Sequence, residues 1–186
     1  MILASLRLWL KLREQNYKKG SWKLSLHFLF FDLRNVSNMN VYITTDGYTL
    51  PSGFIVKEIC CMFPNGEFNH FLLKPPANWR NLGDVDKRTI RYTTRHLNNL
   101  SFHDGWFPYE NIHEIFEKFQ EYHIYTYSDV TIKVIQHFLP TTIVVNVQDI
   151  GFKMPDSLPD ADCFRAHNAR YCAKAKCIAI KDFIES

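Results

Sequence analysis

The C-terminal part of the chain gathers three residues whose side chains bind metal ions. Cys163, His167 and Cys172 lie within a stretch of ten residues, directly before a segment with helical periodicity. Thiolate sulfur and imidazole nitrogen are ligands that Zn²⁺ prefers in proteins, and such clustering is typical of a zinc site. Cysteine is also a common small core residue, so burial without a metal is the competing interpretation.

Length and composition indicate one sizeable folded domain. The chain has 186 residues, of which 46% are hydrophobic and 15% aromatic, enough for one large core. Its net charge of +3 is concentrated in residues 1–38, which carry seven Lys/Arg and two Asp/Glu. Residues 39–186 carry 15 Lys/Arg and 17 Asp/Glu, which excludes a broadly basic nucleic-acid-binding surface. We predict a basic, amphipathic extension over 1–38 and a folded domain over 39–186.

Cysteine usage indicates a reducing, intracellular compartment. The five cysteines are an odd number and Cys60 and Cys61 are adjacent, which argues against a disulfide framework. We assign Cys60, Cys61 and Cys177 to the core and expect the protein in the cytoplasm or nucleus. The acid-poor residues 3–12 leave mitochondrial import as an alternative. No apolar run reaches 18 residues, so no membrane span is expected.

Turn residues and hydrophobic periodicity predict an α/β domain with a mixed five-stranded sheet flanked by helices. The first three strands form an antiparallel meander, and the last two, joined through helices, are parallel additions. Asp129 is expected to act as a helix cap, and the last strand, rich in β-branched residues, to be buried. The strands are expected at residues 41–45, 54–63, 68–73, 124–127 and 142–147, and the helices at 88–97, 109–122, 130–139 and 171–184.

This order of elements resembles the ribonuclease H-like superfamily, especially the DnaQ-like 3′–5′ exonucleases with an Asp-Glu-Asp-Asp-His signature. In those enzymes the carboxylates hold two divalent ions that activate water. Asp46 matches their first aspartate, but Tyr48 stands where the glutamate is expected. Asp129 is the candidate for a later aspartate, and the final His-x4-Asp is matched by His167 followed by Cys172. The resemblance therefore implies a degenerate catalytic site, with Asp46 and Asp129 as its remaining candidates.

The cysteine substitution resembles the Maelstrom domain, a degenerate member of the same superfamily with a Glu-Cys-His-Cys zinc site. The resemblance assigns the four ligands to Glu58, Cys163, His167 and Cys172. Two thiolates, one imidazole and one carboxylate form a closed tetrahedral set for a structural Zn²⁺. A buried glutamate on a hydrophobic strand would cost several kcal/mol without a partner, and metal coordination would remove that cost.

Short motifs are also similar to those of small proteins of the same plan in arthropod genomes and mobile elements. Those proteins often have a His-Gly-Leu where this chain has Asn98-Asn99-Leu100, so a substrate contact made by that histidine has no counterpart at this position. The matching segments are Val56-Lys-Glu58, Lys74-Pro-Pro-x-x-Trp79, Gly105-x-x-Pro-Tyr109 and the segment from Cys163 to Cys172.

These patterns favour a catalytically inactive module with a structural zinc, which binds nucleic acid such as single-stranded RNA or a protein partner. The alternative is an active nuclease on single-stranded RNA or DNA, either metal-independent or with residual metal-dependent 3′–5′ exonuclease activity. The aromatic segment 102–109 could stack on bases or be clamped as a loop. A phosphate path or a solvated surface could be formed by Lys57, Lys74, Arg80, Lys87, Arg88, Arg91 and Arg95.

Overall fold

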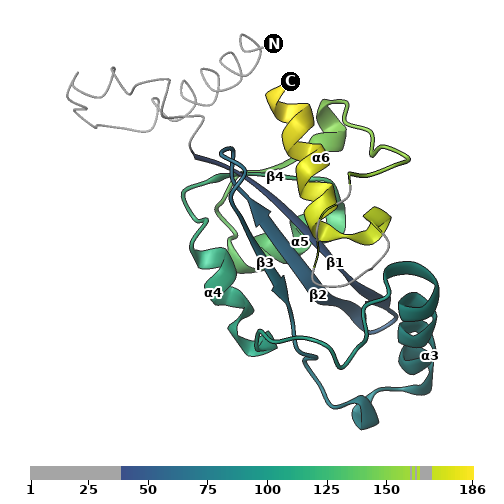
Figure 1. The fold of residues 1–186 in the computed structure, drawn as a ribbon. Helices are drawn as coiled ribbons and strands as arrows, with labels where there is room; N and C mark the ends of the chain where they lie inside the picture. The colour runs from purple at the N-terminus through teal and green to yellow at the C-terminus, as the bar shows by residue number, and fades with distance from the viewer. Residues whose placement is uncertain (1–38, 160, 162, 164–168) are drawn as a thin grey trace, which may run out of the picture. The chain divides into compact units, whose positions relative to one another are not determined.

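A five-stranded sheet organises the domain (Figure 1). The computed structural model describes residues 39–159, 161, 163 and 169–186, so the predicted extension over 1–38 lies outside the described residues. The spatial order of the strands is β3-β2-β1-β4-β5. Their bounds are β1 (Asn40–Leu50), β2 (Gly53–Met62), β3 (Phe68–Leu72), β4 (His123–Thr126) and β5 (Val144–Asn146).

Strand directions agree with the expected mixed sheet. β1, β2 and β3 pair antiparallel, whereas β4 is parallel to β1 and β5 is parallel to β4. The α/β class, the meander and the two parallel additions are therefore confirmed. The β1–β2 register shifts between Asp46 and Gly47, and this bulge bends β1 at Asp46.

Helices cover both faces of the sheet. The helices α4 and α5 lie on one face, and α6 crosses the other (Figure 1). The helical segments are α3 (Asp84–Thr93), α4 (Ile112–Glu117), α5 (Asp129–Phe138) and α6 (Ala173–Glu185), the π-helical η4 (Thr94–Asn98), and the 3₁₀ turns η3 (Trp79–Asn81), η5 (Tyr109–Asn111), η6 (Val147–Ile150) and η7 (Ala169–Tyr171). No helix in these described ranges is long and apolar enough to cross a membrane.

Three local expectations were wrong. The predicted helix over 109–122 is α-helical only from Ile112 to Glu117, because Phe119 and Tyr122 continue in tighter turns. Asp129 is the first residue of α5, and Ser128 before it is the cap, accepting a hydrogen bond from Thr131 N at 3.2 Å. The last strand is a half-buried, three-residue edge strand, so it is not the fully buried strand expected over 142–147.

The alternation of side chains along β1 and β2 produces a separate core on each face of the sheet. Val41 and Ile43 face α4 and α5, whereas Tyr42 faces α6. The same period places Ile59 in the first core and Cys60 in the second. The polar residues that share the α6 face therefore come together between the sheet and that helix.

A buried lysine ties the loop after η4 to the sheet. Lys57 on β2 is fully buried, and its ammonium group donates to the carbonyl oxygens of Leu73 at 2.5 Å, Phe102 at 3.1 Å and Asp104. Its three protons thus match three acceptors. Lys57 is therefore not part of a phosphate path, and Phe102, itself buried, belongs to a clamped loop.

Candidate metal centre

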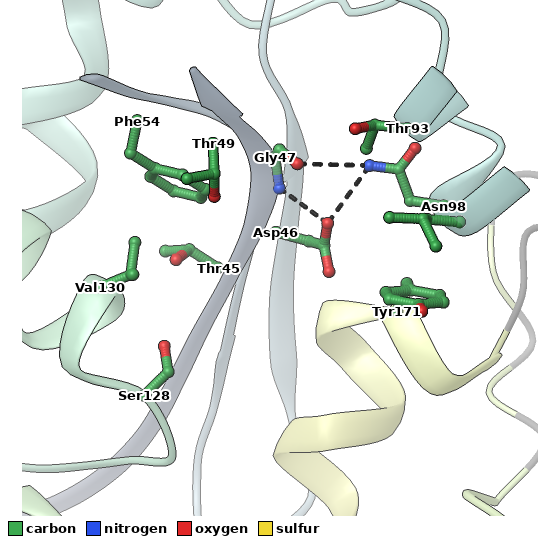
Figure 2. A pocket seen from close by; sticks show the side chains of 11 residues that line it. Thr45, Asp46, Gly47, Thr49, Phe54, Thr93, Asn98, Ser128, Val130 and Tyr171 are labelled. Carbon is green, nitrogen blue, oxygen red and sulfur yellow. Dashed lines mark hydrogen bonds between the residues drawn. The ribbon is translucent and has the colours of Figure 1, made fainter. Parts of the chain in front are cut away.

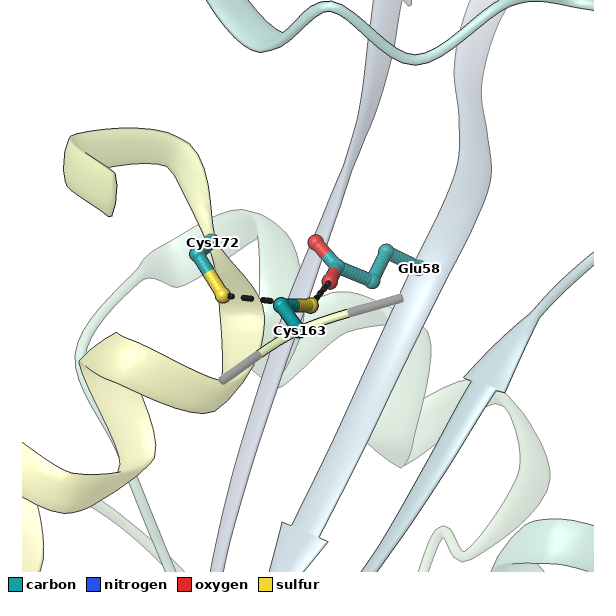
Figure 3. A group of neighbouring side chains, drawn as sticks. All are labelled: Glu58, Cys163 and Cys172. Atoms are coloured by element: carbon teal, nitrogen blue, oxygen red, sulfur yellow. Dashed lines mark hydrogen bonds between the residues drawn. The ribbon is translucent and has the colours of Figure 1, made fainter. Parts of the chain in front are cut away.

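Three of the predicted ligands come together between β2 and the start of α6. One ligand atom from each of Glu58, Cys163 and Cys172 lies within 4.8 Å of the others (Figure 3). Cys163 Sγ is 3.8 Å from Cys172 Sγ and 3.9 Å from Glu58 Oε1. The fourth predicted ligand, His167, lies outside the described residues.

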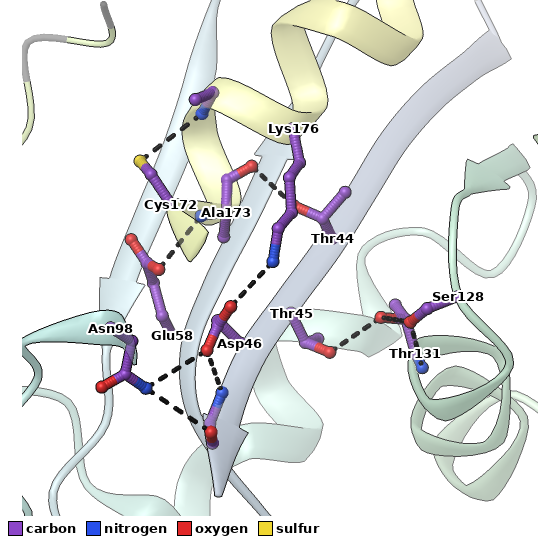
Figure 4. Close-up of polar contacts among 12 residues, drawn as sticks. Thr44, Thr45, Asp46, Glu58, Asn98, Ser128, Thr131, Cys172, Ala173 and Lys176 are labelled. Atoms are coloured by element: carbon purple, nitrogen blue, oxygen red, sulfur yellow. Dashed lines mark hydrogen bonds and ion pairs between the residues drawn. The ribbon is translucent and has the colours of Figure 1, made fainter. Parts of the chain in front are cut away.

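The carboxylate of Glu58 has protein partners of its own. Glu58 is 1% exposed, and its Oε2 accepts a hydrogen bond from Ala173 N at 3.0 Å (Figure 4). Since Ala173 is the first residue of α6, the positive end of that helix faces the carboxylate. These hydrogen-bonding and dipole contacts already compensate part of the cost of burying the Glu58 carboxylate. A metal would add to these contacts.

Cys172 caps the last helix with its sulfur. It is the N-cap of α6, is 2% exposed, and accepts a hydrogen bond from Ala175 N at 3.5 Å. Amide groups at a helix N-terminus favour the thiolate over the thiol, and the thiolate is the form that binds metals. The helix start thus orients a sulfur ligand toward Cys163.

His70 on β3 is a member of this cluster that the sequence patterns did not identify. Its Nε2 lies 2.5 Å from Glu58 Oε1, and its Nδ1 lies 3.7 Å from Cys163 Sγ. The signal that could have revealed it is the register, because His70 pairs with Cys60, which shares a sheet face with Glu58. The described residues thus place an imidazole against both Glu58 and Cys163.

Asp46 lies in a pocket beside this cluster. The pocket measures about 290 Å³, and its lining includes Asp46, Asn98, Ser128 and Tyr171 (Figure 2). Asp129 is not among the lining residues. It is exposed at the start of α5 and accepts a hydrogen bond from Asn146 Nδ2 at 3.1 Å. Asp46 thus lines this pocket and Asp129 does not, although its chain neighbours Ser128 and Val130 do.

The charge of Asp46 is offset within the protein. Lys176 on α6 places its Nζ 2.7 Å from Oδ2, and Oδ1 accepts from Gly47 N at 2.7 Å and Asn98 Nδ2 at 3.3 Å (Figure 4). Burial raises the pKa of the Asp46 carboxyl, and the nearby Lys176 ammonium opposes that rise. Neither Lys176 nor Asn98 was predicted as a partner, because both are distant from Asp46 in the sequence.

We expect Lys176→Met to lower the free energy of unfolding by about 2 kcal/mol, since the buried Asp46 carboxylate loses its cation. The matched control is Lys181→Met on the same helix, which breaks the more exposed pair with Glu185 and should cost less than about 0.5 kcal/mol. Urea unfolding of both variants measures the difference. Equal losses would contradict a special role for Lys176.

The stability that Lys176→Met loses relative to the wild type depends on pH, and the pKa of Asp46 determines the direction. The pKa of Asp46 in the folded chain already lies above its ordinary value of 3.8, and losing Lys176 raises it further. Between the unfolded and folded pKa values the folded chain then binds more protons than the unfolded chain, so the stability of the variant falls as pH rises. The deficit of Lys176→Met should be smaller near pH 4 than near neutral pH.

No protein-family model, no curated protein and no solved structure matches the chain. The chemistry of the site therefore follows from its own donor set. Two sulfurs and one carboxylate can bind a single divalent ion of the zinc type, for which mixed sulfur, nitrogen and oxygen ligands are usual.

Proposed function

We propose that residues 39–186 form a zinc-stabilised, catalytically inactive ribonuclease H-like domain that acts by binding a partner, either nucleic acid or protein. The observation that carries the proposal is the convergence of Glu58, Cys163 and Cys172 from segments more than 100 residues apart. The two cysteines also pack in the core on the α6 face of the sheet, but apolar packing does not account for a buried carboxylate beside two thiols. A shared cation would account for all three.

The donor set suits a structural role for zinc. Two thiolates and one carboxylate carry three negative charges, and Zn²⁺ would compensate most of them at a buried position. His167, the predicted fourth ligand, would close the tetrahedron and leave no position for a reacting water. The ion would then fasten the start of α6 to β2 and the loop at Cys163.

The surroundings of Asp46 support the loss of catalysis. Two-metal hydrolysis needs several carboxylates that share two ions. Asp46 instead pairs with Lys176, and Tyr48, at the position where a glutamate is expected, is fully buried and donates to Leu100 O at 2.5 Å. An ammonium group and a tyrosine at these positions do not hold Mg²⁺, which prefers oxygen anions.

Metal analysis and a nuclease assay on the full chain test the proposal together. We expect about one equivalent of zinc per chain. We also expect no degradation of labelled single-stranded RNA or DNA with Mg²⁺ or Mn²⁺ present. Absence of zinc from protein purified without chelator would contradict the zinc assignment.

The competing function is an active nuclease, and a matched variant distinguishes it. Degradation that is lost in Asp46→Asn, which keeps the shape of the side chain, would replace our proposal by a metal-dependent enzyme. Degradation that persists in Asp46→Asn and without divalent ions would indicate metal-independent cleavage. Either result would overturn the assignment as an inactive domain while the zinc measurement still stood.

A further inference from the structure

One side of α3 and η4 exposes a row of cationic and aromatic side chains, which we call the arginine stripe. Its members are spaced three and four residues apart, so they lie on one side of the helix over successive turns. The opposite side carries Ile90, which is 2% exposed and packs with Tyr48 and Leu50 of β1. The arginine stripe consists of Arg88, Arg91, Tyr92, Arg95 and His96, all of which are exposed.

The arginines of the stripe outnumber the acidic residues on the same side of α3. Within residues 39–159, 161, 163 and 169–186, none of Arg88, Arg91 and Arg95 forms an ion pair. The acidic residue on this side, Asp84, is confined to the first turn of α3, where it suits the helix dipole. Three adjacent arginines beside one aspartate create a local positive field on a domain whose overall composition is slightly acidic.

Aromatic rings lie directly beside these cations. The Arg91 guanidinium stands 5.3 Å from the centroid of the Trp79 ring, a cation–π contact that limits its freedom. Tyr92 is 60% exposed and its ring lies 4.8 Å from that of His96. An unpaired base is a flat ligand that can stack on an exposed tyrosine ring of this kind.

We propose that the arginine stripe binds single-stranded nucleic acid, with the three arginines pairing with consecutive phosphates and Tyr92 stacking on a base. The inference rests on the proposed function, because it names the partner of a domain that acts by binding. Guanidinium groups pair with phosphate oxygens in a bidentate manner, and every base offers a face for stacking. The arginines thus fit the phosphates and Tyr92 fits the bases, and both groups repeat along a nucleic-acid strand.

The rings favour a single strand over two other anionic partners. Bases in a duplex are stacked on each other and are not available to Tyr92, whereas unpaired bases are. An acidic peptide would satisfy the arginines but would leave Tyr92 and His96 exposed. Both alternatives are outcomes of the test below.

Fluorescence anisotropy of the full chain with labelled oligonucleotides of about 20 nucleotides, RNA or DNA, tests the inference at about 50 mM salt. Arg88→Gln/Arg91→Gln/Arg95→Gln should weaken binding by about tenfold or more and reduce the slope of log K against log salt by about 2. Tyr92→Ala should weaken it by about fivefold or more. The matched control is Lys118→Gln/Lys133→Gln/Lys153→Gln, which removes the same charge from exposed positions elsewhere and should bind like the wild type.

Several results would overturn the inference. These are no binding by the wild type, equal losses in the two triple variants, tighter binding of a duplex of equal length, or equal competition by poly-glutamate. Zinc content and thermal midpoint, measured on the same preparations, separate these results from a failure of the proposed function. A zinc-loaded, folded chain that binds no oligonucleotide refutes the arginine stripe alone, whereas a chain without zinc refutes the zinc-stabilised domain.

Discussion

Cys172→Ser is expected to abolish zinc binding and to lower the melting temperature of the chain by about 10 °C. At free zinc about 1,000-fold above its Kd, a bound ion stabilises the fold by about 4 kcal/mol. For a domain of this size, each kcal/mol corresponds to about 2–4 °C. Metal analysis and thermal unfolding with and without a chelator measure both effects.

This substitution separates a metal ligand from a helix cap. Cys172 is the N-cap of α6, and serine is among the best N-cap residues. If the sulfur only capped the helix, Cys172→Ser would keep or increase the stability, and a chelator would change neither protein. If the sulfur binds zinc, the variant should resemble the chelated wild type and should show no further loss with chelator.

A control cysteine lies on the other side of the sheet. Cys61 is fully buried in the core against α4 and α5, away from the cluster. Cys61→Ala should lose about 1–2 kcal/mol from the small cavity but keep one equivalent of zinc. Loss of zinc in Cys61→Ala as well would mean that metal content reports only general unfolding, and the ligand assignment would fail.

The role of His70 can be tested by its effect on zinc affinity. Its contact with Glu58 at 2.5 Å orients that carboxylate if zinc is held by Glu58, Cys163 and Cys172. We expect His70→Gln to weaken zinc affinity by about 10-fold to 100-fold, the effect usual for residues that position metal ligands. Competition with a chromogenic chelator gives the affinity. An unchanged affinity would show that His70 only fills space beside Glu58.

The parts of the fold that the sequence revealed are those with a local cause. β2 and β3 were found because Pro64, Asn65 and Gly66 mark the turn between two hydrophobic runs. The periodicity of α5 was correct, but its cap was not, since both Ser128 and Asp129 suit that position and only the backbone geometry decides. β5 was expected to be buried because of its β-branched residues, but its position at the sheet edge is a property of the strand order.

The partners within the site depend on tertiary structure, which is why several were missed. Cys163 and Cys172 are close in sequence and gave a direct signal. Lys176 reaches Asp46 across 130 residues, and nothing in the sequence near either residue indicates the pair. The pairing depends on α6 crossing the face of β1 that carries Asp46.

Lys57→Met is expected to lower the free energy of unfolding by about 3 kcal/mol, because three backbone carbonyls lose a charged donor in the protein interior. Methionine keeps the apolar stem, so the cost reports on the ammonium group. Lys74→Met, at an exposed position just after β3, is the control and should change stability by less than about 0.5 kcal/mol. Hydrogen exchange should show faster exchange in the loop over 101–106 in Lys57→Met alone.

The difference in the free energy of unfolding between the wild type and Lys57→Met changes with pH in a predictable direction. Burial lowers the pKa of Lys57 from its ordinary value of 10.5 to about 8. Between those two values the unfolded chain binds more protons than the folded chain, so Lys57 makes the stability of the wild type rise with pH. Lys57→Met lacks this titration, while the tyrosines and cysteines that titrate in the same range are common to both proteins.

The deficit of Lys57→Met should therefore be smallest below pH 8 and widen toward pH 10.5. Urea unfolding of both proteins across this range measures it. A variant as stable as the wild type at neutral pH would mean that dehydrating the ammonium costs as much as its three hydrogen bonds return. In that case the loop carrying Phe102 and Asp104 would be held by Phe102 packing on Tyr48, and not by Lys57.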